Sequence, residues 1–384
     1  MKCLALLIVL SLLSLKSKAQ NDSHIEQVQF KRLHLASESY ESAGVFDINN
    51  DNHPDIVSGS YWYEGPDFTK RHYIGPVTQH GEYWEDFATV PIDVNNDGLM
   101  DYVTGDWFTK KIWWCENPGD NSQWKTHVID QTGNVETLRG WDINNDGRLE
   151  IVPNNPNQPL KFYKLNTNGN SNQNGYFTKI NVADNQGHGL GFGDINGDGR
   201  GDLIISSGWL EAPSSIDNGT WKLHNDFDLG TASVPVIVAD VNRDGKNDLI
   251  VGQAHGYGLD WYEQTISSGH GKWKKHPIDP YNSQYHTMEW VDIDNDGNNE
   301  LVTGKRYHAH NGKDPGANDP IGLYYFKWNG ESFVKETIAY GSLGVGKGAG
   351  LYFSVKDLNG SGRKDIVVAG KDGLDIFFNE GYKK

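Results

Sequence analysis

Cysteine is nearly absent from this sequence of 384 residues, and so are methionine and long apolar runs beyond the first twenty residues. The two cysteines are Cys3 and Cys115, and we expect Cys3 to be removed with the N-terminal segment described below. No intramolecular disulfide can then stabilise the remaining chain. The lack of a second apolar run also excludes a later membrane span.

Basic residues are scarce relative to acidic ones. Lysine and arginine number 34 against 51 aspartates and glutamates, which gives a formal net charge of −17. Binding to phosphates requires a basic footprint, so we expect no nucleic-acid partner. The acidic residues therefore need another explanation, and their positions supply one.

The N-terminus has the pattern of a signal peptide. Lys2 is followed by an apolar run over residues 4–15, and Ser17 and Ala19 place small residues three positions and one position before a cleavage site. This run is too short to span a bilayer. We therefore expect residues 1–19 to be a cleaved signal peptide and the mature chain to be secreted or periplasmic.

One acidic motif recurs seven times, with Asp at position 1, Asn or Asp at position 3, usually Asp at position 5, usually Gly at position 6 and an acid at position 9. Each copy is followed by an apolar run, an aromatic run and, in several copies, a Trp-Lys-x-His-like run. Four short strands in each unit are typical of propeller blades. The residues at positions 1, 3, 5 and 9 are Asp47, Asn49, Asp51 and Asp55; Asp93, Asn95, Asp97 and Asp101; Asp142, Asn144, Asp146 and Glu150; Asp194, Asn196, Asp198 and Asp202; Asp240, Asn242, Asp244 and Asp248; Asp292, Asp294, Asp296 and Glu300; and Asp357, Asn359, Ser361 and Asp365.

The two ends of the repeat array complement each other. The last repeat ends after its third strand, at residues 374–379, while residues 30–34 carry an isolated fourth-strand pattern before the first repeat. The N-terminal strand can therefore complete the last blade and remove the unpaired strand edges. The sequence predicts an all-β fold, a single seven-bladed β-propeller of four-stranded blades over residues 20–384.

The acidic motif has the chemistry of a calcium site. Oxygen ligands at alternate positions point to one centre, and glycine at position 6 allows a sharp turn. Position 12 lacks the glutamate that an EF-hand requires. The loops of blades one and seven depart from the pattern, with Asn52 at the glycine position and Ser361 at position 5. We expect structural Ca²⁺ in these loops; the alternative is a set of Asx-turn hairpins without metal.

These units resemble the FG-GAP/VCBS repeats of calcium-binding seven-bladed propellers over essentially the whole mature chain. The resemblance implies that each loop joins the innermost strand of a blade to its second strand, which places all seven loops on one face. The opposite face then collects the connections that enter first strands and those that link second to third strands.

The histidines divide between these regions. Five belong to the fourth-strand pattern and are expected to be structural: His34, His72, His127, His224 and His276. Six others fall in connections assigned to the face without calcium loops: His80, His188, His255, His286, His308 and His310. Imidazole is the side chain best suited to proton transfer near neutral pH, so we expect a site on this face.

Position relative to each loop adds further candidates. Six residues before the first loop aspartate stand Glu41, Glu136, His188 and His286, which should be equivalent at the mouth of the central channel. Aromatic residues near imidazoles and carboxylates suit a sugar. We expect substrate contacts from Glu41, Trp62, His80, Trp107, Glu136, Trp209, His308 and His310. The long connection over residues 306–320 is expected to be a flap over this site.

Three functions fit such a site. The first is β-elimination on a poly- or oligosaccharide, either neutral or acidic, with Tyr307 and His188 as acid and base, Arg139, Arg306 and His286 as charge-stabilising groups, and His255 as a further catalytic residue. The scaffold and this face also resemble propeller-type ulvan lyases and the propeller part of aldos-2-ulose dehydratases. The histidines could instead hold Zn²⁺ or another divalent metal acting as a Lewis acid. The other two functions are a glycan-binding, lectin-like propeller and an adhesion module.

Overall fold

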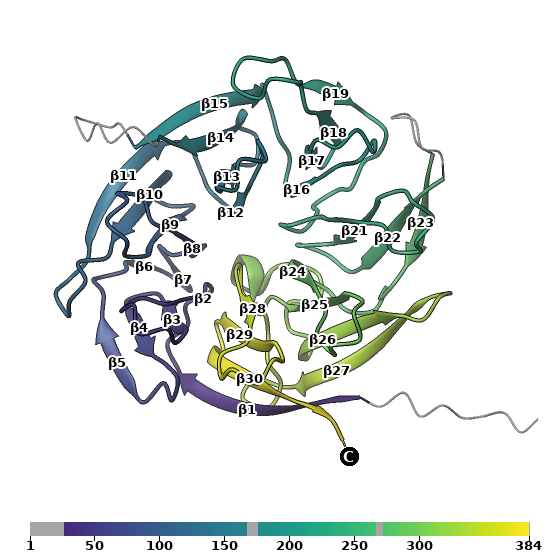
Figure 1. Cartoon of the computed structure of the whole chain (residues 1–384). Coiled ribbons are helices and arrows are strands. Elements are labelled where there is room, and N and C mark those ends of the chain that lie inside the picture. The colour runs from purple at the N-terminus through teal and green to yellow at the C-terminus, as the bar shows by residue number, and fades with distance from the viewer. Residues whose placement is uncertain (1–26, 167–175, 266–271, 384) are drawn as a thin grey trace, which may run out of the picture.

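The computed structural model describes residues 27–166, 176–265 and 272–383. The expected signal peptide, residues 1–19, lies outside the described residues. Seven four-stranded antiparallel sheets are arranged around a central axis as the blades of a propeller (Figure 1). The fold prediction from the repeats is confirmed.

The blades follow one another in chain order. Within each blade, the first strand listed below lies next to the axis and the fourth lies at the outer edge. Blade one is β2 (Gly44–Phe46), β3 (Asp55–Ser58), β4 (Tyr61–Glu64) and β5 (Lys70–Tyr73); blade two is β8 (Val90–Ile92), β9 (Asp101–Gly105), β10 (Lys111–Glu116) and β11 (Lys125–Gln131); blade three is β12 (Thr137–Trp141), β13 (Glu150–Asn154), β14 (Leu160–Leu165) and β15 (Phe177–Ala183); blade four is β16 (Leu190–Gly193), β17 (Asp202–Ile205), β18 (Gly208–Glu211) and β19 (Lys222–His224). Blade five is β20 (Ile237–Ala239), β21 (Asp248–Gly252), β22 (Leu259–Gln264) and β23 (Trp273–Pro277); blade six is β24 (Tyr285–Val291), β25 (Glu300–Lys305), β26 (Ile321–Trp328) and β27 (Phe333–Gly341); blade seven is β28 (Ser354–Lys356), β29 (Asp365–Gly370), β30 (Gly373–Tyr382) and β1 (Val28–Ala36).

The N-terminal strand closes the ring. β1 pairs antiparallel with β30, with Phe30 opposite Asn379 and His34 opposite Asp375. The first and last described strands thus share one sheet, and the edge of β30 is covered along most of its length. Ring closure of this kind removes an edge that would otherwise be free to pair with another chain.

Apolar side chains pack between neighbouring blades. Val57 and Trp62 of blade one, for example, lie in one buried cluster with Tyr102 and Trp113 of blade two. The second strands are buried on both faces, as β9 and β21 show, because a blade packs against each side of them. The fourth strands β11 and β15 consist of exposed and half-buried residues because one of their faces meets solvent.

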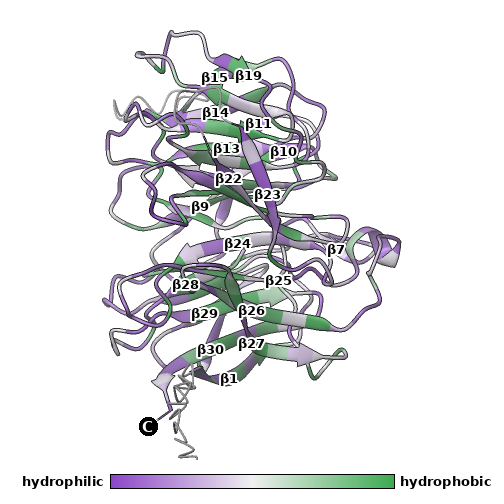
Figure 2. Cartoon of the chain, turned by 90° about the vertical axis from the view of Figure 1, so that its right-hand side faces the viewer, coloured by the Kyte–Doolittle hydropathy of each residue, from purple (hydrophilic) through white to green (hydrophobic). Residues whose placement is uncertain are grey.

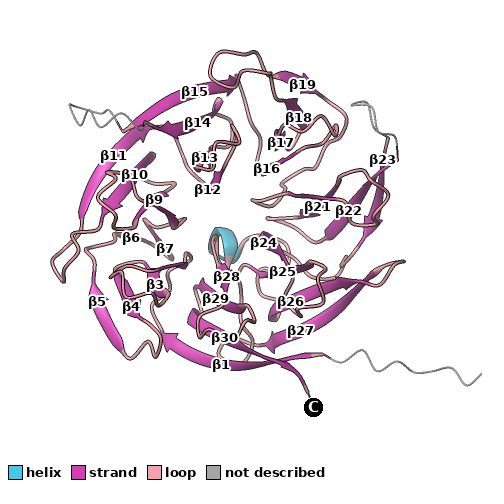
Figure 3. Cartoon of the chain, viewed as in Figure 1, coloured by secondary structure: helices cyan, strands magenta, loops and turns pink. Residues whose placement is uncertain are grey.

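The first strand of each blade runs toward its acidic loop, so the strands begin at one mouth of the channel and end at the loop face. β12, for instance, begins next to Glu136 and ends just before Asp142. Two additional elements lie on the mouth side (Figures 2 and 3). They are the hairpin of β6 (Gln79–His80) and β7 (Tyr83–Trp84), which precedes blade two, and the helical turn η1 (Ala309–Gly312), which belongs to the connection between β25 and β26. In the described residues, no helix is long and apolar enough to cross a membrane.

Candidate functional site

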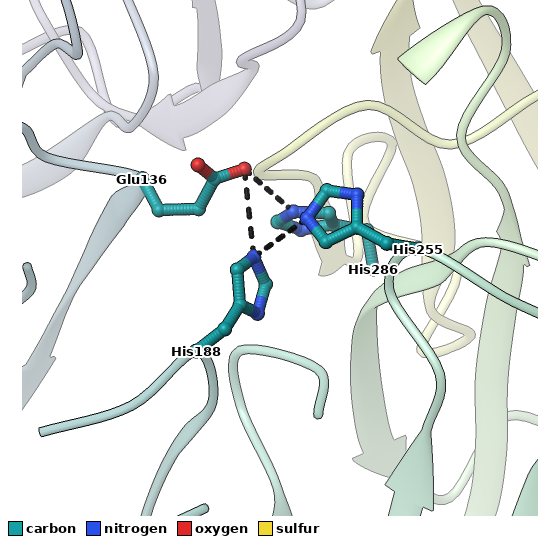
Figure 4. Close-up of side chains that lie close together, drawn as sticks. All are labelled: Glu136, His188, His255 and His286. Carbon is teal, nitrogen blue, oxygen red and sulfur yellow. Dashed lines mark hydrogen bonds and ion pairs between the residues drawn. The ribbon is translucent and has the colours of Figure 1, made fainter. Parts of the chain in front are cut away.

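Four side chains converge at the channel mouth: Glu136, His188, His255 and His286 (Figure 4). They come from four blades. Glu136 and His188 lie just before the first strands β12 and β16, His286 is the second residue of β24, and His255 lies between β21 and β22. One ligand atom from each lies within 4.8 Å of the others. Glu136, His188 and His286, which occupy the same position relative to their acidic loops, therefore do lie together. The connection in blade five adds His255.

The hydrogen bonds of His188 and His255 place a proton on one nitrogen of each ring. Nδ1 of His188 lies 2.8 Å from the carbonyl oxygen of Ala232. Nδ1 of His255 lies 2.8 Å from a carboxylate oxygen of Asp314. A carbonyl or carboxylate oxygen only accepts, so both Nδ1 atoms donate, and in the neutral ring of His255 the Nε2 atom then carries the lone pair. These two Nε2 atoms lie 2.9 Å apart.

Glu136 approaches the same point. Its Oε1 lies 2.9 Å from Nε2 of His286 and 3.7 Å from Nε2 of His188. Burial alone would raise the pKa of Glu136, but interactions with His188 and His286 outweigh it and hold that pKa well below its ordinary value. Burial lowers the pKa of His286 well below its ordinary value, and burial with the neighbouring His188 lowers that of His255 to about 4. The group is thus an anionic carboxylate with two imidazoles that stay neutral at pH 7.

Arg306 links this group to Glu41. Its Nε donates to Glu41 at 2.8 Å and its Nη1 donates to Glu136 at 3.2 Å. All three side chains are at most 7% exposed. Burial alone would lower the pKa of Arg306, but the two carboxylates raise it above its ordinary value. A buried guanidinium between two carboxylates is a fixed scaffold for the mouth of the channel.

A pocket of about 350 Å³ opens beside this group. Glu136 and Arg306 lie at its polar end, and the flap, residues 306–320, contributes His310, Asn311 and Lys313. The remaining lining is aromatic: Tyr83, Phe87, Trp107 and Phe108. An apolar wall beside a few directed polar groups is typical of a small-molecule site and suits the C–H face and hydroxyl groups of a sugar ring.

Comparisons with known proteins bear on the fold. The model for the FG-GAP-like repeat matches residues 93–153, 142–205 and 240–303. The chain is a seven-bladed propeller that contains FG-GAP-like repeats. No curated protein matches its sequence.

Solved structures resemble this FG-GAP propeller at low identity. A chain of the crystal structure of BBS1N in complex with ARL6DN aligns with a TM-score of 0.52 and 12% identity, over 92% of this chain and 97% of that one. The crystal structure of rhamnogalacturonan lyase YesW aligns with a TM-score of 0.45 and 15% identity, over 92% of this chain and 74% of that one. At 12% identity the first likeness concerns the fold alone, and the second, with a TM-score below 0.5, supports no conclusion.

Not all the residues expected at the site join the central group. Arg139 lies further along β12, where it donates to Val234 and Thr287 at 2.5 Å each and stacks over Tyr352. The ring of Tyr307 stacks on His308, which itself pairs with Glu82 at 3.2 Å. His80 pairs with Glu85 at 2.6 Å and stacks on Phe108. In the part of the chain that the structure describes, no hydrogen bond joins Tyr307 to the central group.

The expectation for Trp62 and Trp209 is corrected by their burial. They are 5% and 0% exposed and lie on third strands, not in connections at the mouth. Each indole stacks on the fourth-strand histidine directly opposite, His72 or His224, with 4.1 Å between ring centroids. These pairs belong to the core of the FG-GAP propeller and offer no surface to a sugar. Trp107 is 37% exposed and does line the pocket.

The acidic loops share one conformation. Positions 4 and 6 have positive φ in all seven, including Asn52, which stands at the usual glycine position with φ 68°. In blade two, Asp93 accepts the amide N–H groups of Asp97 and Gly98, while Asp101 accepts those of Val94 and Asn117. The position-9 acid therefore attaches the loop to the end of the third strand, beyond the ligand role that the sequence suggests. Blade six alone has an acid at position 3, and there Asp292, Asp294 and Glu300 lie close enough to hold an ion.

Two residues at the site were missed from the sequence. Asp314 accepts from His255 and, at 2.9 Å, from His310. Tyr83 lies over Lys371 and Arg306, with 3.9 and 5.8 Å from each cation to the ring centroid. Both stand in the two longest insertions on the mouth face, which is the signal that could have singled them out.

Proposed function

We propose that this FG-GAP propeller is an exported carbohydrate-active lyase or dehydratase. It acts by β-elimination at the channel mouth, with a divalent metal, zinc in the first place, held by Glu136, His188, His255 and His286. The one observation that carries this proposal is the pair of Nε2 atoms, of His188 and His255, that face each other at 2.9 Å. Two unprotonated nitrogens at this distance repel, so a proton or a metal ion must lie between them, and the nearby carboxylate and third imidazole offer the further ligands that a metal requires.

The donor set fits zinc. Three imidazole nitrogens and one carboxylate oxygen are common zinc ligands, and bonds of about 2.0–2.1 Å at tetrahedral angles separate ligand atoms by about 3.3 Å. The pairs described above are separated by 2.9, 2.9 and 3.7 Å. His188 and His255 each donate their other ring N–H to an oxygen, the arrangement that orients metal-bound histidines.

The chemistry would be divided between the metal and the pocket. A bound metal would polarise a carbonyl or carboxylate oxygen of the substrate. The aromatic wall would hold the sugar ring, and a base would remove the proton on the adjacent carbon as the C–O bond to the leaving group breaks and a C=C bond forms. The leaving oxygen takes up a proton, so the reaction needs no redox partner.

The proton-transfer role falls best to Tyr83 in this proposal. His188 has both ring nitrogens engaged, and Tyr307 faces His308. The phenol of Tyr83 lines the pocket that contains Glu136 and Arg306. Burial raises the pKa of Tyr83, while the guanidinium of Arg306 opposes that shift. Tyr83 can therefore exchange a proton beside a cation that favours its phenolate.

Two further assignments complete the proposal. The seven acidic loops hold structural Ca²⁺, because positions 1, 3 and 5 present oxygen atoms on a tight, glycine-supported turn. The mature chain, from about Gln20 onward, is secreted or periplasmic, because the first nineteen residues have the composition of a signal peptide.

The test combines metal content with product analysis. After zinc loading and dialysis, we expect one tightly bound zinc per wild-type chain and none in the His188→Ala/His286→Ala double variant. His80→Ala is the matched control on the same face. Acidic polysaccharides and keto-sugars are then screened for ultraviolet absorbance of a new conjugated double bond. Tyr83→Phe should keep its zinc and lose about 10²–10⁴-fold in kcat.

Several results would contradict the proposal. Equal zinc content in the double variant would exclude the metal site. Glycan binding without turnover would favour a lectin, and saturated products would indicate hydrolysis instead of elimination.

A further inference from the structure

Within the described chain, Asp314 is the flap residue beyond Arg306 whose side chain hydrogen-bonds to the central group. Its two carboxylate oxygens accept from Nδ1 of His255 at 2.8 Å and from Nδ1 of His310 at 2.9 Å. The ring of His310 is stacked on that of His255, with centroids 4.3 Å apart and planes 12° from parallel. The side chains of His255 and Asp314 are each only 11% exposed. The flap thus covers His255 and bonds to the nitrogen opposite the one that faces Glu136, His188 and His286.

The flap is anchored mainly by polar contacts. Lys305 donates to Ser283 at 2.7 Å and to the carbonyl of Gly316. At the other side of the flap, Tyr83 accepts the N–H of Asn311 at 3.1 Å and Lys371 donates to the carbonyl of His308 at 2.7 Å. Water can replace such polar contacts when the flap opens, so they hold the flap without fixing it as an apolar core would.

The backbone of the flap is in a costly conformation. His308, His310 and Asn311 have φ of 54°, 48° and 54°. The left-handed region costs a residue with a side chain roughly 1–2 kcal/mol, somewhat less for asparagine. Three such residues within four positions persist only where the surrounding contacts hold them. Here those contacts are the ones to Tyr83, Lys371 and, through Asp314, His255.

We propose that Asp314 is a positioning residue that orients His255 for the metal, so that closure of the flap and metal binding are coupled. This inference rests on the proposed metal site. With the flap closed, Asp314 holds the proton on Nδ1 of His255 and leaves Nε2 free as a ligand. With the flap open, His255 loses that orientation and the metal loses part of its affinity. By thermodynamic linkage, the metal must then favour the closed flap by the same factor.

Zinc affinity and hydrogen exchange test both halves of this linkage. Asp314→Ala should weaken zinc binding by about 10–100-fold, the usual effect of losing such a partner. Zinc should slow amide exchange in residues 307–320 of the wild-type chain by a comparable factor, and in Asp314→Ala by less than about twofold. A merely structural role for Asp314 would not make flap protection depend on zinc.

Asp319→Ala is the matched control. Asp319 is the other aspartate at the end of the flap, and it accepts from Tyr257 at 2.6 Å. Its loss removes a contact to an exposed tyrosine and none to His255, so zinc affinity should stay within about threefold of that of the wild-type chain. Asp314→Asn, which retains one carbonyl oxygen, guards against a folding defect and should give an intermediate affinity.

The outcomes separate this inference from the proposal beneath it. If the wild-type chain binds zinc and Asp314→Ala binds it equally well, Asp314 does not position His255, and the metal site stands. If the wild-type chain itself binds no zinc, both the metal site and the coupling are wrong.

Discussion

A single buried carboxylate between blades one and two illustrates what burial does to one residue. Asp86 is 3% exposed and accepts the N–H of Gly59 at 2.9 Å and the hydroxyl of Thr104 at 3.2 Å. Among the described residues it has no ion-pair partner. Burial therefore raises its pKa to about 7. Its ordinary value in an unfolded chain is about 3.9.

This shift predicts a pH dependence of stability. The folded state prefers the protonated acid, so its contribution is fully present below about pH 4 and is lost as the pH rises through about 7. Asp86→Asn, which cannot ionise, should match the wild-type chain near pH 4 and exceed its stability at pH 8, by at most about 4 kcal/mol. Urea unfolding of both chains between pH 4 and 8, in saturating calcium, measures the difference. A constant difference across this range would show that Asp86 is already ionised in the folded state.

At the scale of one element, the acidic loop demands two left-handed residues. Position 4 is asparagine in four loops and glycine in two, the residues that adopt this conformation at least cost. Blade five is the exception, with Arg243 at φ 61°. The seven loops can therefore be compared with one another, because six have asparagine or glycine at this left-handed position and one has arginine.

Exchanging these residues should change stability in opposite directions. Arg243→Asn should stabilise the fold by about 0.5–1 kcal/mol, and Asn145→Arg in blade three, at φ 59°, should destabilise it by a similar amount. Denaturant midpoints at constant calcium measure both. Equal stability of both variants and the wild-type chain would mean that the backbone conformation contributes little at this position.

At the scale of the whole molecule, charge is segregated between the two faces. The loops contribute 21 of the 51 acidic residues at positions 1, 3, 5 and 9, all on the face opposite the channel mouth. The net charge of −17 therefore reflects the loops and does not argue against an anionic sugar at the mouth. A cation in each loop would relieve the repulsion within that face.

Calcium removal should therefore weaken the whole ring. If each loop binds with a Kd of about 10⁻⁴–10⁻³ M, 1 mM calcium contributes about 0.4–1.4 kcal/mol per site to the folded state. We expect EGTA to lower Tm markedly, calcium to restore it and magnesium to do so poorly. Calorimetry with and without chelator measures this. An unaltered Tm would exclude a structural role for calcium and leave the loops as Asx turns.

The sequence alone determined the architecture. Each blade repeats the same local sequence pattern, an Asx-rich turn followed by short apolar and aromatic strands. Seven copies of this pattern therefore predict seven blades, and no distant contact has to be known. The unmatched strand patterns at the two ends also predicted ring closure, because strand pairing completes whatever edge is left. Even the convergence of Glu41, Glu136, His188 and His286 near the mouth followed from register.

Only the tertiary structure decided which of those residues form one site. Trp62 and Trp209 looked like binding residues, but their place opposite fourth-strand histidines buries them in the core. His255, His310 and Asp314 come from two separate connections, whose paths no repeat rule fixes. The backbone path of such an insertion is set by its tertiary contacts with the folded propeller. Local sequence patterns therefore predicted the blades, whereas the site depended on the positions that the irregular loops take in the folded chain.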